Sequence, residues 1–397
     1  MIKTYEPVVR HGLAGWDRKK ISPEELQQRL SRIRTAMRAR KLAVLIIHGD
    51  ARQYGDLCYA THFAPMVHEA VAFIPREENP VLYVGVGPRD IPFARKLTAV
   101  EEVHPLARLE GEIGLRLRYW LPKQGRVGLV NVQESMRAPL YESLLADLSD
   151  LPLEPCTAWY RELRLGKTAA ELAVMREATQ RLDRCVEAIL GALRPGVSER
   201  DLAVEADYVA RRQGAEDCRV LVTSGPDADR FLRPATVAPI APQGRLLVYV
   251  ALAFERYWSE LGSTIILSPG GADLSPADDE LSRLYDKLRQ GLAAGDAGQH
   301  ALRKAGKALR LHLDAHQATG EGEVQGIGLD REEAPLQPLL GAAAETAAPL
   351  RPGMVVSPRI LRFAAGAGAL CAEPLVLGES GCERLSGTER VILRSLR

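Results

Sequence analysis

The stretch LRLGKTAAELAVMREATQRLDRCVEAILGALRPGVSERDLA, residues 163–203, decides how the second half of this chain folds. Thr168 followed by Glu171 has the pattern of a capping box, and apolar residues then recur at helical spacing for about seven turns. Ser198, three residues before an aspartate, repeats this pattern, and Gly214 is a stop signal for the helix that begins there. The stretch therefore predicts two consecutive helices joined by a short Pro-Gly turn.

Strand-like segments follow these helices. RLLVYVALAF (245–254) and YWSELGSTIILSPG (257–270) predict the two strands of an antiparallel hairpin. Two more helices are expected at about 276–294 and 296–317. The last part of the chain is rich in strand candidates, namely MVVSPRIL (354–361), EPLVLG (373–378) and RVILRS (390–395). Helices segregated from antiparallel strands indicate an α+β domain.

The first part of the chain has a different pattern. ISPEELQQRLSRIRTAMRARK (21–41) predicts a helix with Ser22 as its N-cap and Pro23 at the first helical position. Apolar strand candidates follow, with helical pieces between some of them, at 42–49, 71–75, 80–87 and 126–130. The alternation predicts an α/β N-terminal domain over residues 1–155, followed by the α+β domain over residues 156–397.

Composition excludes several classes of function. The chain has 52 basic and 51 acidic side chains, and this balance argues against binding of nucleic acid through bulk charge. It has no apolar signal region at the N-terminus and no uninterrupted apolar stretch of about 18 residues, so we expect a cytoplasmic protein without a membrane segment. The six cysteines form no CxxC pair, which favours buried free thiols over disulfides or a zinc site.

Several stretches, taken in order, resemble the motifs of the creatinase/prolidase/aminopeptidase P family, peptidase family M24. They are LRLGKTAAELAVMREA (163–178), ALRPGVSERDLA (192–203), VQGIGLDREEAP (324–335), and LRPGMVVSPRI (350–360) with GESGCERLSG (378–387). The resemblance implies the pita-bread fold of that family for the C-terminal domain, and a homodimer. The N-terminal half is similar to the smaller domain of the family more loosely, through RLSRIRTAMRARKLAVLII and GDLCYATHFAP.

The metallopeptidases of this family hold two metal ions with two Asp, one His and two Glu. The first Asp position falls on Ala251, or on Tyr249 if no deletion is assumed, and the second falls on Glu260. The other three positions carry Gln325, Arg359 and Ala372, with Glu373 one position from the last. A guanidinium beside a divalent cation is unfavourable, so we expect no metal and no other cofactor.

Creatinase itself cleaves a C–N bond without metal, so the loss of ligands does not imply the loss of activity. Its catalytic histidine falls here on Leu232 or Arg233, and one of its glutamates falls on Gly262. The second family histidine is Glu332, followed by a retained Glu333. The creatinase mechanism therefore does not transfer residue by residue.

The same positions predict a polar site. Its expected catalytic carboxylates are Glu260, Glu333 and Glu373, and its expected substrate-binding residues are Arg233, Gln325, Glu332, Arg359 and Trp258. Guanidinium groups can hold an anionic ligand bidentately, and a carboxylate can act as general base. The alternative is a decayed site whose polar residues only form ion pairs. His312 and His316, four residues apart on a predicted helix, are expected to be a solvated face rather than a metal site.

Three hypotheses of function follow. The first is a metal-independent, creatinase-like hydrolase or lyase that acts at a C–N bond of a small nitrogen-containing carboxylate. The second is an inactive pita-bread relative that binds a ligand or a protein partner. The third is an Xaa-Pro metallopeptidase, which the missing metal ligands disfavour.

Overall fold

The computed structural model describes residues 15–109, 116–117, 119–121, 125–268, 274–341 and 349–394. The expected absence of a signal region rests on the N-terminus, of which residues 1–14 lie outside the described residues. Two compact units are present, Met1–Arg164 and Leu165–Arg397. The boundary between the two units follows Arg164. It lies later than the predicted boundary after residue 155, because the short helix α8 (Thr157–Glu162) belongs to the first unit.

The first unit is built on a mixed sheet. Its strands are β1 (Leu42–Asp50), β2 (Glu69–Pro75), β3 (Val81–Val84), β4 (Glu102–Pro105), β5 (Arg126–Val130) and β6 (Leu153–Pro155). They lie in the order β4-β3-β2-β1-β5-β6, with β1 parallel to β5 and β5 parallel to β6. The parallel pairs β1-β5, β5-β6 and β3-β4, with helices between strands, confirm the α/β class predicted for this half.

Helices complete the first unit. They are α2 (Pro23–Ala39), α3 (Gly55–Thr61), α4 (Ile91–Ala94), α6 (Val132–Ser135), α7 (Ala138–Asp147) and α8. The predicted cap of α2 is present, since the hydroxyl of Ser22 accepts the backbone N–H of Glu25. The buried apolar cluster of the unit includes Val44, Phe73 and Leu129 from three strands.

The second unit has four long helices among its described residues, α9 (Ala169–Ala192), α10 (Glu199–Arg212), α11 (Pro276–Gly291) and α12 (Gly295–Ala315). The first two begin at the predicted capping boxes, in which Thr168 and Ser198 exchange hydrogen bonds with the residue three positions on. Gly214 follows the end of α10 with φ +84°, the left-handed conformation that glycine adopts without strain. The helix signals of the sequence are therefore confirmed.

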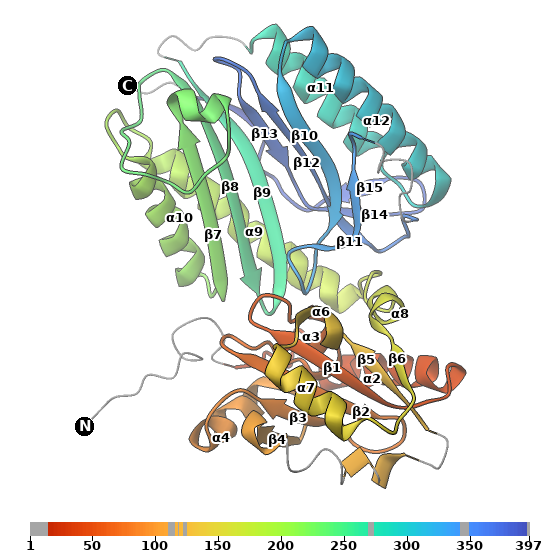
Figure 1. Ribbon diagram of the computed structural model, residues 1–397. Coiled ribbons are helices and arrows are strands. Elements are labelled where there is room, and N and C mark those ends of the chain that lie inside the picture. The colour runs from red at the N-terminus through yellow and green to blue at the C-terminus, as the bar shows by residue number, and fades with distance from the viewer. Residues whose placement is uncertain are drawn as a thin grey trace, which may run out of the picture. The chain divides into compact units, whose positions relative to one another are not determined.

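The strands of the second unit are β7 (Asp217–Ser224), β8 (Gly244–Phe254), β9 (Tyr257–Leu267), β10 (Thr319–Gly326), β11 (Glu333–Pro338), β12 (Val355–Phe363), β13 (Ala369–Ala372), β14 (Leu375–Leu377), β15 (Cys382–Arg384) and β16 (Val391–Arg394). Seven of them lie in the order β11-β10-β12-β13-β9-β8-β7 (Figure 1). The predicted hairpin is β8 with β9, paired antiparallel along its whole length. The last strand, β16, differs from expectation because it runs parallel to β9.

The helices of the second unit cover one face of its sheet. The hydroxyl of Thr179 in α9 lies 2.8 Å from that of Ser259 in β9. Val324 of β10 and Ile360 of β12 belong to the apolar cluster that contains the buried leucines of α11 and α12. Because side chains alternate along a strand, the neighbours of these residues in β9, β10 and β12 point to the opposite face.

The described part of the chain contains no helix that is both long and apolar enough to cross a membrane. The cysteines are free and buried or half-buried, as the sequence predicted.

Candidate functional site

The face of the sheet opposite the helices carries the positions at which the family has its metal ligands. Residues paired directly across two strands place their side chains on the same face. Glu323 pairs with Arg359, Arg359 with Ala372, Ala372 with Gly262, and Gly262 with Tyr249. This row crosses five strands and brings side chains that are far apart in the sequence onto one surface.

Glu260 lies at the centre of the polar contacts on this face, two residues before Gly262 in β9. One oxygen of its fully buried carboxylate accepts the hydroxyl of Tyr249 at 2.5 Å. The other accepts the side-chain amide of Gln325 at 2.9 Å. Burial and the nearby carboxylate raise the pKa of Tyr249 well above its ordinary value, so the phenol remains a proton donor at neutral pH. We refer to Tyr249, Glu260, Gln325 and Arg331 as the Glu260 cluster.

Arg331 connects the buried cluster to solvent. Its guanidinium donates to the hydroxyl of Tyr249 at 3.1 Å and lies 3.9 Å from the carboxylate of Glu260. It also forms an ion pair with the exposed Glu332, and its own side chain is 25% exposed. Hydrogen bonds therefore run from Arg331 through Tyr249 to Glu260, with Gln325 as the second donor to that carboxylate.

Trp258 lies on the same face of β9 as Glu260, two residues earlier, and is buried. The guanidinium of Arg219 lies 4.8 Å from the centre of its ring. Arg219 pairs across β7 and β8 with Ala251, which in turn pairs with Glu260, so its side chain lies on the cluster's face. Trp258 and Arg219 thus form an aromatic and cationic flank beside Glu260.

Glu333 makes a separate buried pair. Its carboxylate accepts a hydrogen bond from the ammonium of Lys167 at 2.6 Å and one from the backbone N–H of Asp330 at 3.1 Å. Gly328 leaves room for this pair, since a Cβ there would lie 2.7 Å from the side chain of Lys167. A carboxylate bound by a buried ammonium is a poor general base. The contacts of Glu333 therefore favour a structural role over the predicted catalytic one.

Arg359 lies on the predicted face but is already paired. It forms an ion pair with Glu323, its partner across β10 and β12. Its side chain is 23% exposed, and the neighbouring carboxylate neutralises its charge. The structure therefore supports Arg331, rather than Arg359, as the guanidinium nearest to Glu260.

Arg233 is not part of the Glu260 cluster, contrary to prediction. Its guanidinium donates to Glu199 of α10 at 2.6 Å and to Asp227 at 2.9 Å. Burial alone would raise the pKa of Glu199, but hydrogen bonds from Arg233, Ser224 and Thr236 lower it to about 2. Both carboxylate partners of Arg233 lie outside the Glu260 cluster, so its guanidinium is not directed at the candidate site.

Glu373 also does not lie where it was predicted, at the last ligand position. Ala372, the last residue of β13, occupies the row beside Arg359, and Glu373 follows after the strand ends. The buried carboxylate of Glu373 accepts a hydrogen bond from Arg384 at 2.7 Å and lies 3.8 Å from Arg390 and 3.9 Å from Arg289. The last ligand position therefore carries an alanine, and Glu373 is a structural carboxylate.

The side chains at the five ligand positions do not fit two divalent cations. The first position offers a phenol on Tyr249 or a methyl group on Ala251, and the others offer a carboxylate, an amide, a guanidinium and a methyl group, on Glu260, Gln325, Arg359 and Ala372. The only carboxylate is already bonded by two donors, and the amide presents its N–H rather than its oxygen to Glu260. Hard dications require several converging oxygen or imidazole donors, which this face lacks at these positions.

Three contributors were not predicted from the sequence. Arg331 stands inside the quoted motif VQGIGLDREEAP and is the only cation between Gly326 and Pro335, a signal that could have identified it. Lys167 stands inside a quoted motif, but nothing in the sequence indicates its partner. Arg219 could be identified only from strand pairing.

The second unit therefore has the pita-bread architecture, with side chains at the five ligand positions that do not fit two divalent cations. The model of metallopeptidase family M24 matches residues 173–371, about half of the chain. The chain belongs to metallopeptidase family M24, as the sequence motifs implied. Its pita-bread fold, preceded by a smaller domain, is confirmed by the structural comparisons that follow.

Relatives and solved structures agree with this assignment. The uncharacterized peptidase YqhT of Bacillus subtilis is 28% identical over 273 residues, 66% of this chain and 73% of YqhT. Among solved structures, the prolidase from Pyrococcus horikoshii OT3 superposes with a TM-score of 0.75 at 17% identity, covering 91% of this chain and 99% of that one. The X-Pro aminopeptidase from Thermotoga maritima MSB8 gives 0.76 at 18% identity, covering 92% and 99%. Both structures are similar to this chain in fold.

Proposed function

We propose that this chain is an M24 enzyme that acts at a C–N bond of a small nitrogen-containing carboxylate without the two metal ions of the family. The observation that carries the proposal is the hydrogen-bonded sequence from Arg331 through Tyr249 to Glu260. Near the positions at which the family binds metal, this chain therefore has a proton donor, a carboxylate and a cation. Such a set can bind an anion and move a proton without a Lewis acid.

Recognition of the carboxylate falls to the guanidinium groups on this face. Arg331, paired with Glu332, and Arg219, 3.7 Å from Asp217, have side chains that are 25% and 47% exposed. A ligand carboxylate, which guanidinium binds bidentately, would replace these surface partners. Ser357, paired with Gln325 across β12 and β10, adds a buried hydroxyl that makes no hydrogen bond within the described residues. A buried hydroxyl of this kind is available to bind a polar group of a ligand.

Proton transfer falls to Glu260 and Tyr249. Glu260 is the proton acceptor, and Tyr249 stands between it and Arg331, where it can pass on a proton taken from the substrate or from an attacking water. Gln325 holds the second oxygen of Glu260 and so fixes the orientation of the carboxylate. Trp258 closes one side of this arrangement.

A thermal-shift screen tests the proposal. Metal-depleted protein is combined with amidino, amino-acid and cyclic-amide carboxylates, because a ligand that binds only the native state raises the melting temperature. We expect stabilisation by at least one carboxylate, lost in Arg331→Gln and kept in Arg176→Gln, whose guanidinium is paired with Glu383 at the surface. Absence of stabilisation by the whole panel would contradict the proposal.

A second candidate, a non-catalytic relative that binds a ligand or protein partner, is favoured by one observation. The carboxylates expected to act are already engaged, Glu260 by two neutral donors and Glu333 by Lys167. Mass spectrometry of a stabilising carboxylate after incubation separates the two candidates. Conversion to products supports the enzyme, and an unchanged ligand supports the binding protein.

The names of the relatives favour a third candidate. A curated relative, the Xaa-Pro dipeptidase of Pyrococcus furiosus, is 24% identical over 244 residues, 59% of this chain and 66% of that protein. Hydrolysis of an Xaa-Pro dipeptide that requires Mn²⁺, Co²⁺ or Zn²⁺ would support this reading. The homodimer implied by the resemblance stays a proposal, which light scattering of the purified protein tests.

A further inference from the structure

A second polar cluster lies on the other side of the sheet, among the helices. We infer that Glu280 of α11, together with His312 of α12 and His316 at the C-cap of that helix, forms a zinc site that is separate from the Glu260 cluster. Within the described residues, the ligand atoms of these three side chains all lie within 4.8 Å of one another. The expectation that the two histidines form a solvated face is wrong for His312, which is 7% exposed.

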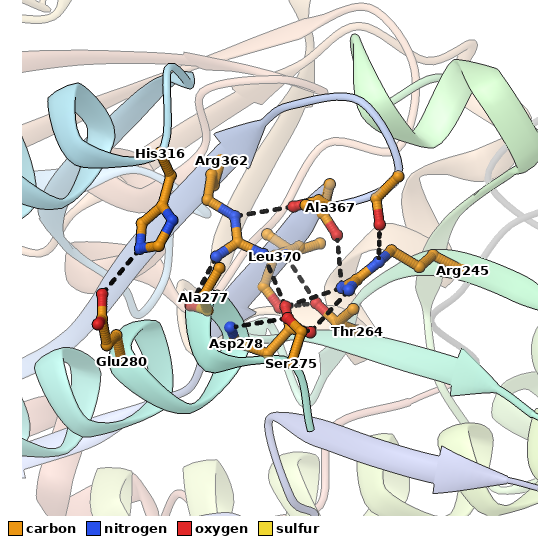
Figure 2. Close-up of polar contacts among 12 residues, drawn as sticks. Arg245, Thr264, Ser275, Ala277, Asp278, Glu280, His316, Arg362, Ala367 and Leu370 are labelled. Carbon is orange, nitrogen blue, oxygen red and sulfur yellow. Dashed lines mark hydrogen bonds and ion pairs between the residues drawn. The ribbon is translucent and has the colours of Figure 1, made fainter. Parts of the chain in front are cut away.

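The helices place these donors together for a simple reason. Residues four apart on a helix share one face, and the imidazole centres of His312 and His316 lie 4.6 Å apart. α11 packs beside α12 and contributes Glu280 from the neighbouring helix, as Figure 2 shows for its contact with His316. The donor set, two imidazoles and one carboxylate with a position left for water, is one that zinc accepts.

Two of the three distances between donors are close to those around a zinc ion. Zinc bonds of about 2.0–2.1 Å in tetrahedral geometry place neighbouring donor atoms about 3.3 Å apart. The Oε2 atom of Glu280 lies 2.8 Å from Nε2 of His316 and 3.5 Å from Nδ1 of His312. These two pairs need shifts of about half an ångström or less, whereas the two imidazole nitrogens lie within 4.8 Å of each other, so the rings must also turn towards each other to hold the ion.

Arg362 makes zinc binding at His312 less favourable, because its guanidinium contacts the other nitrogen of the same ring. Arg362 lies 3.2 Å from Nε2 of His312 and can only donate, so the ring proton of the metal-free protein sits on Nδ1. Binding at Nδ1 moves that proton and removes this one contact of Arg362.

Arg362 can tolerate that loss. It also donates to the carbonyl oxygens of Ala277 and Ala367 and to the carboxylate of Asp278, three contacts that do not involve the histidine (Figure 2). Asp278 also pairs with Arg245, so one carboxylate faces two guanidinium groups, and their remaining positive charge lowers the affinity of the neighbouring site for a cation. We therefore expect binding that is weaker than at a fully preorganised site but still stoichiometric.

Zinc titration of chelator-treated full-length protein by calorimetry tests the site. We expect one equivalent of zinc per chain, with affinity reduced about tenfold or more in His316→Ala and in Glu280→Gln. His300→Ala removes an exposed imidazole of the same helix and is the matched control, with unchanged affinity expected. Both ligand variants change side chains that are at least a quarter exposed, so the fold is expected to persist, which circular dichroism checks.

Cobalt substitution gives a second readout. Co²⁺ bound by these donors is expected to show the visible absorption of a four- or five-coordinate N/O site, lost in His316→Ala and kept in Glu260→Gln. Zinc binding that is unchanged in His316→Ala, or that is lost in Glu260→Gln, would overturn the inference. Less than one equivalent bound to wild-type protein at a tenfold excess of zinc would overturn it as well.

Discussion

The hydroxyl of Tyr249 lies 2.5 Å from the carboxylate of Glu260, where the metallopeptidases that this chain resembles place two metal-binding aspartates. A tyrosine and a carboxylate at this distance satisfy each other without an ion between them. The remaining oxygen of Glu260 is held by Gln325, and the guanidinium of Arg331 lies 3.9 Å away, so two hydrogen bonds and one nearby cation stabilise the buried charge.

Replacing Tyr249 by phenylalanine removes one of these two donors. We expect Tyr249→Phe to lower the free energy of unfolding by about 1.5–3 kcal/mol, the range for a hydrogen bond to a charged group. Urea unfolding at pH 7 measures the change. Tyr208→Phe, at a half-exposed position of α10, is the control and should change stability by less than about 0.5 kcal/mol. Equal effects of the two variants would contradict the assigned role of Tyr249.

The pair of Lys167 and Glu333 is buried on both sides, with side chains 3% and 2% exposed. Lys167→Met leaves the carboxylate without its ammonium, and we expect a loss of about 3–5 kcal/mol in unfolding free energy. The double variant Lys167→Met/Glu333→Leu should recover most of that loss, since a buried ion pair is often replaceable by apolar residues. A double variant as unstable as the single one would show that the charges themselves are required.

Glu199 makes stability depend on pH. Burial raises its pKa, but hydrogen bonds from Arg233, Ser224 and Thr236 outweigh this effect and bring it to about 2, against about 4.3 in an unfolded chain. The folded state binds the proton less readily, so this contribution is complete above pH 4.3 and is lost as the pH falls towards 2. Glu199→Gln should therefore remove about 2–3 kcal/mol at pH 6 and much less near pH 2.5.

Urea unfolding of wild type and variant at pH 6, 4 and 3 gives the test of this pH dependence. Glu205→Gln, on the same helix, should leave the dependence as in wild type. A constant difference between wild type and Glu199→Gln at all three values would contradict the assignment.

Local signals in the sequence predicted most of the fold. The capping residues Thr168 and Ser198 and the apolar hairpin need only neighbouring residues to be recognised, and each appears where it was expected. The strand β13 was not predicted, because four residues carry too little periodicity. The parallel pairing of β16 with β9 joins segments that are distant in the sequence, so no local sequence pattern predicts it.

The candidate site was harder to predict because it depends on register. Ala372 and Glu373 differ by one position, which in a strand exchanges one face for the other. The sequence could not choose between them, nor show that Arg359 is neutralised by Glu323 while Arg331 reaches Tyr249. Glu260 and Gln325 were identified because a family motif fixed their positions, and their contact confirms only that they lie together.

The most direct test of the central claim is product formation by metal-depleted protein. The carboxylate that stabilises the protein is incubated with it before and after addition of Mn²⁺, Co²⁺ or Zn²⁺, and products are followed by mass spectrometry, with an Xaa-Pro dipeptide in parallel. We predict cleavage of the carboxylate without metal, lost in Arg331→Gln, and no metal-dependent cleavage of the dipeptide. Hydrolysis of the dipeptide only after metal is added would contradict a metal-independent Glu260 cluster.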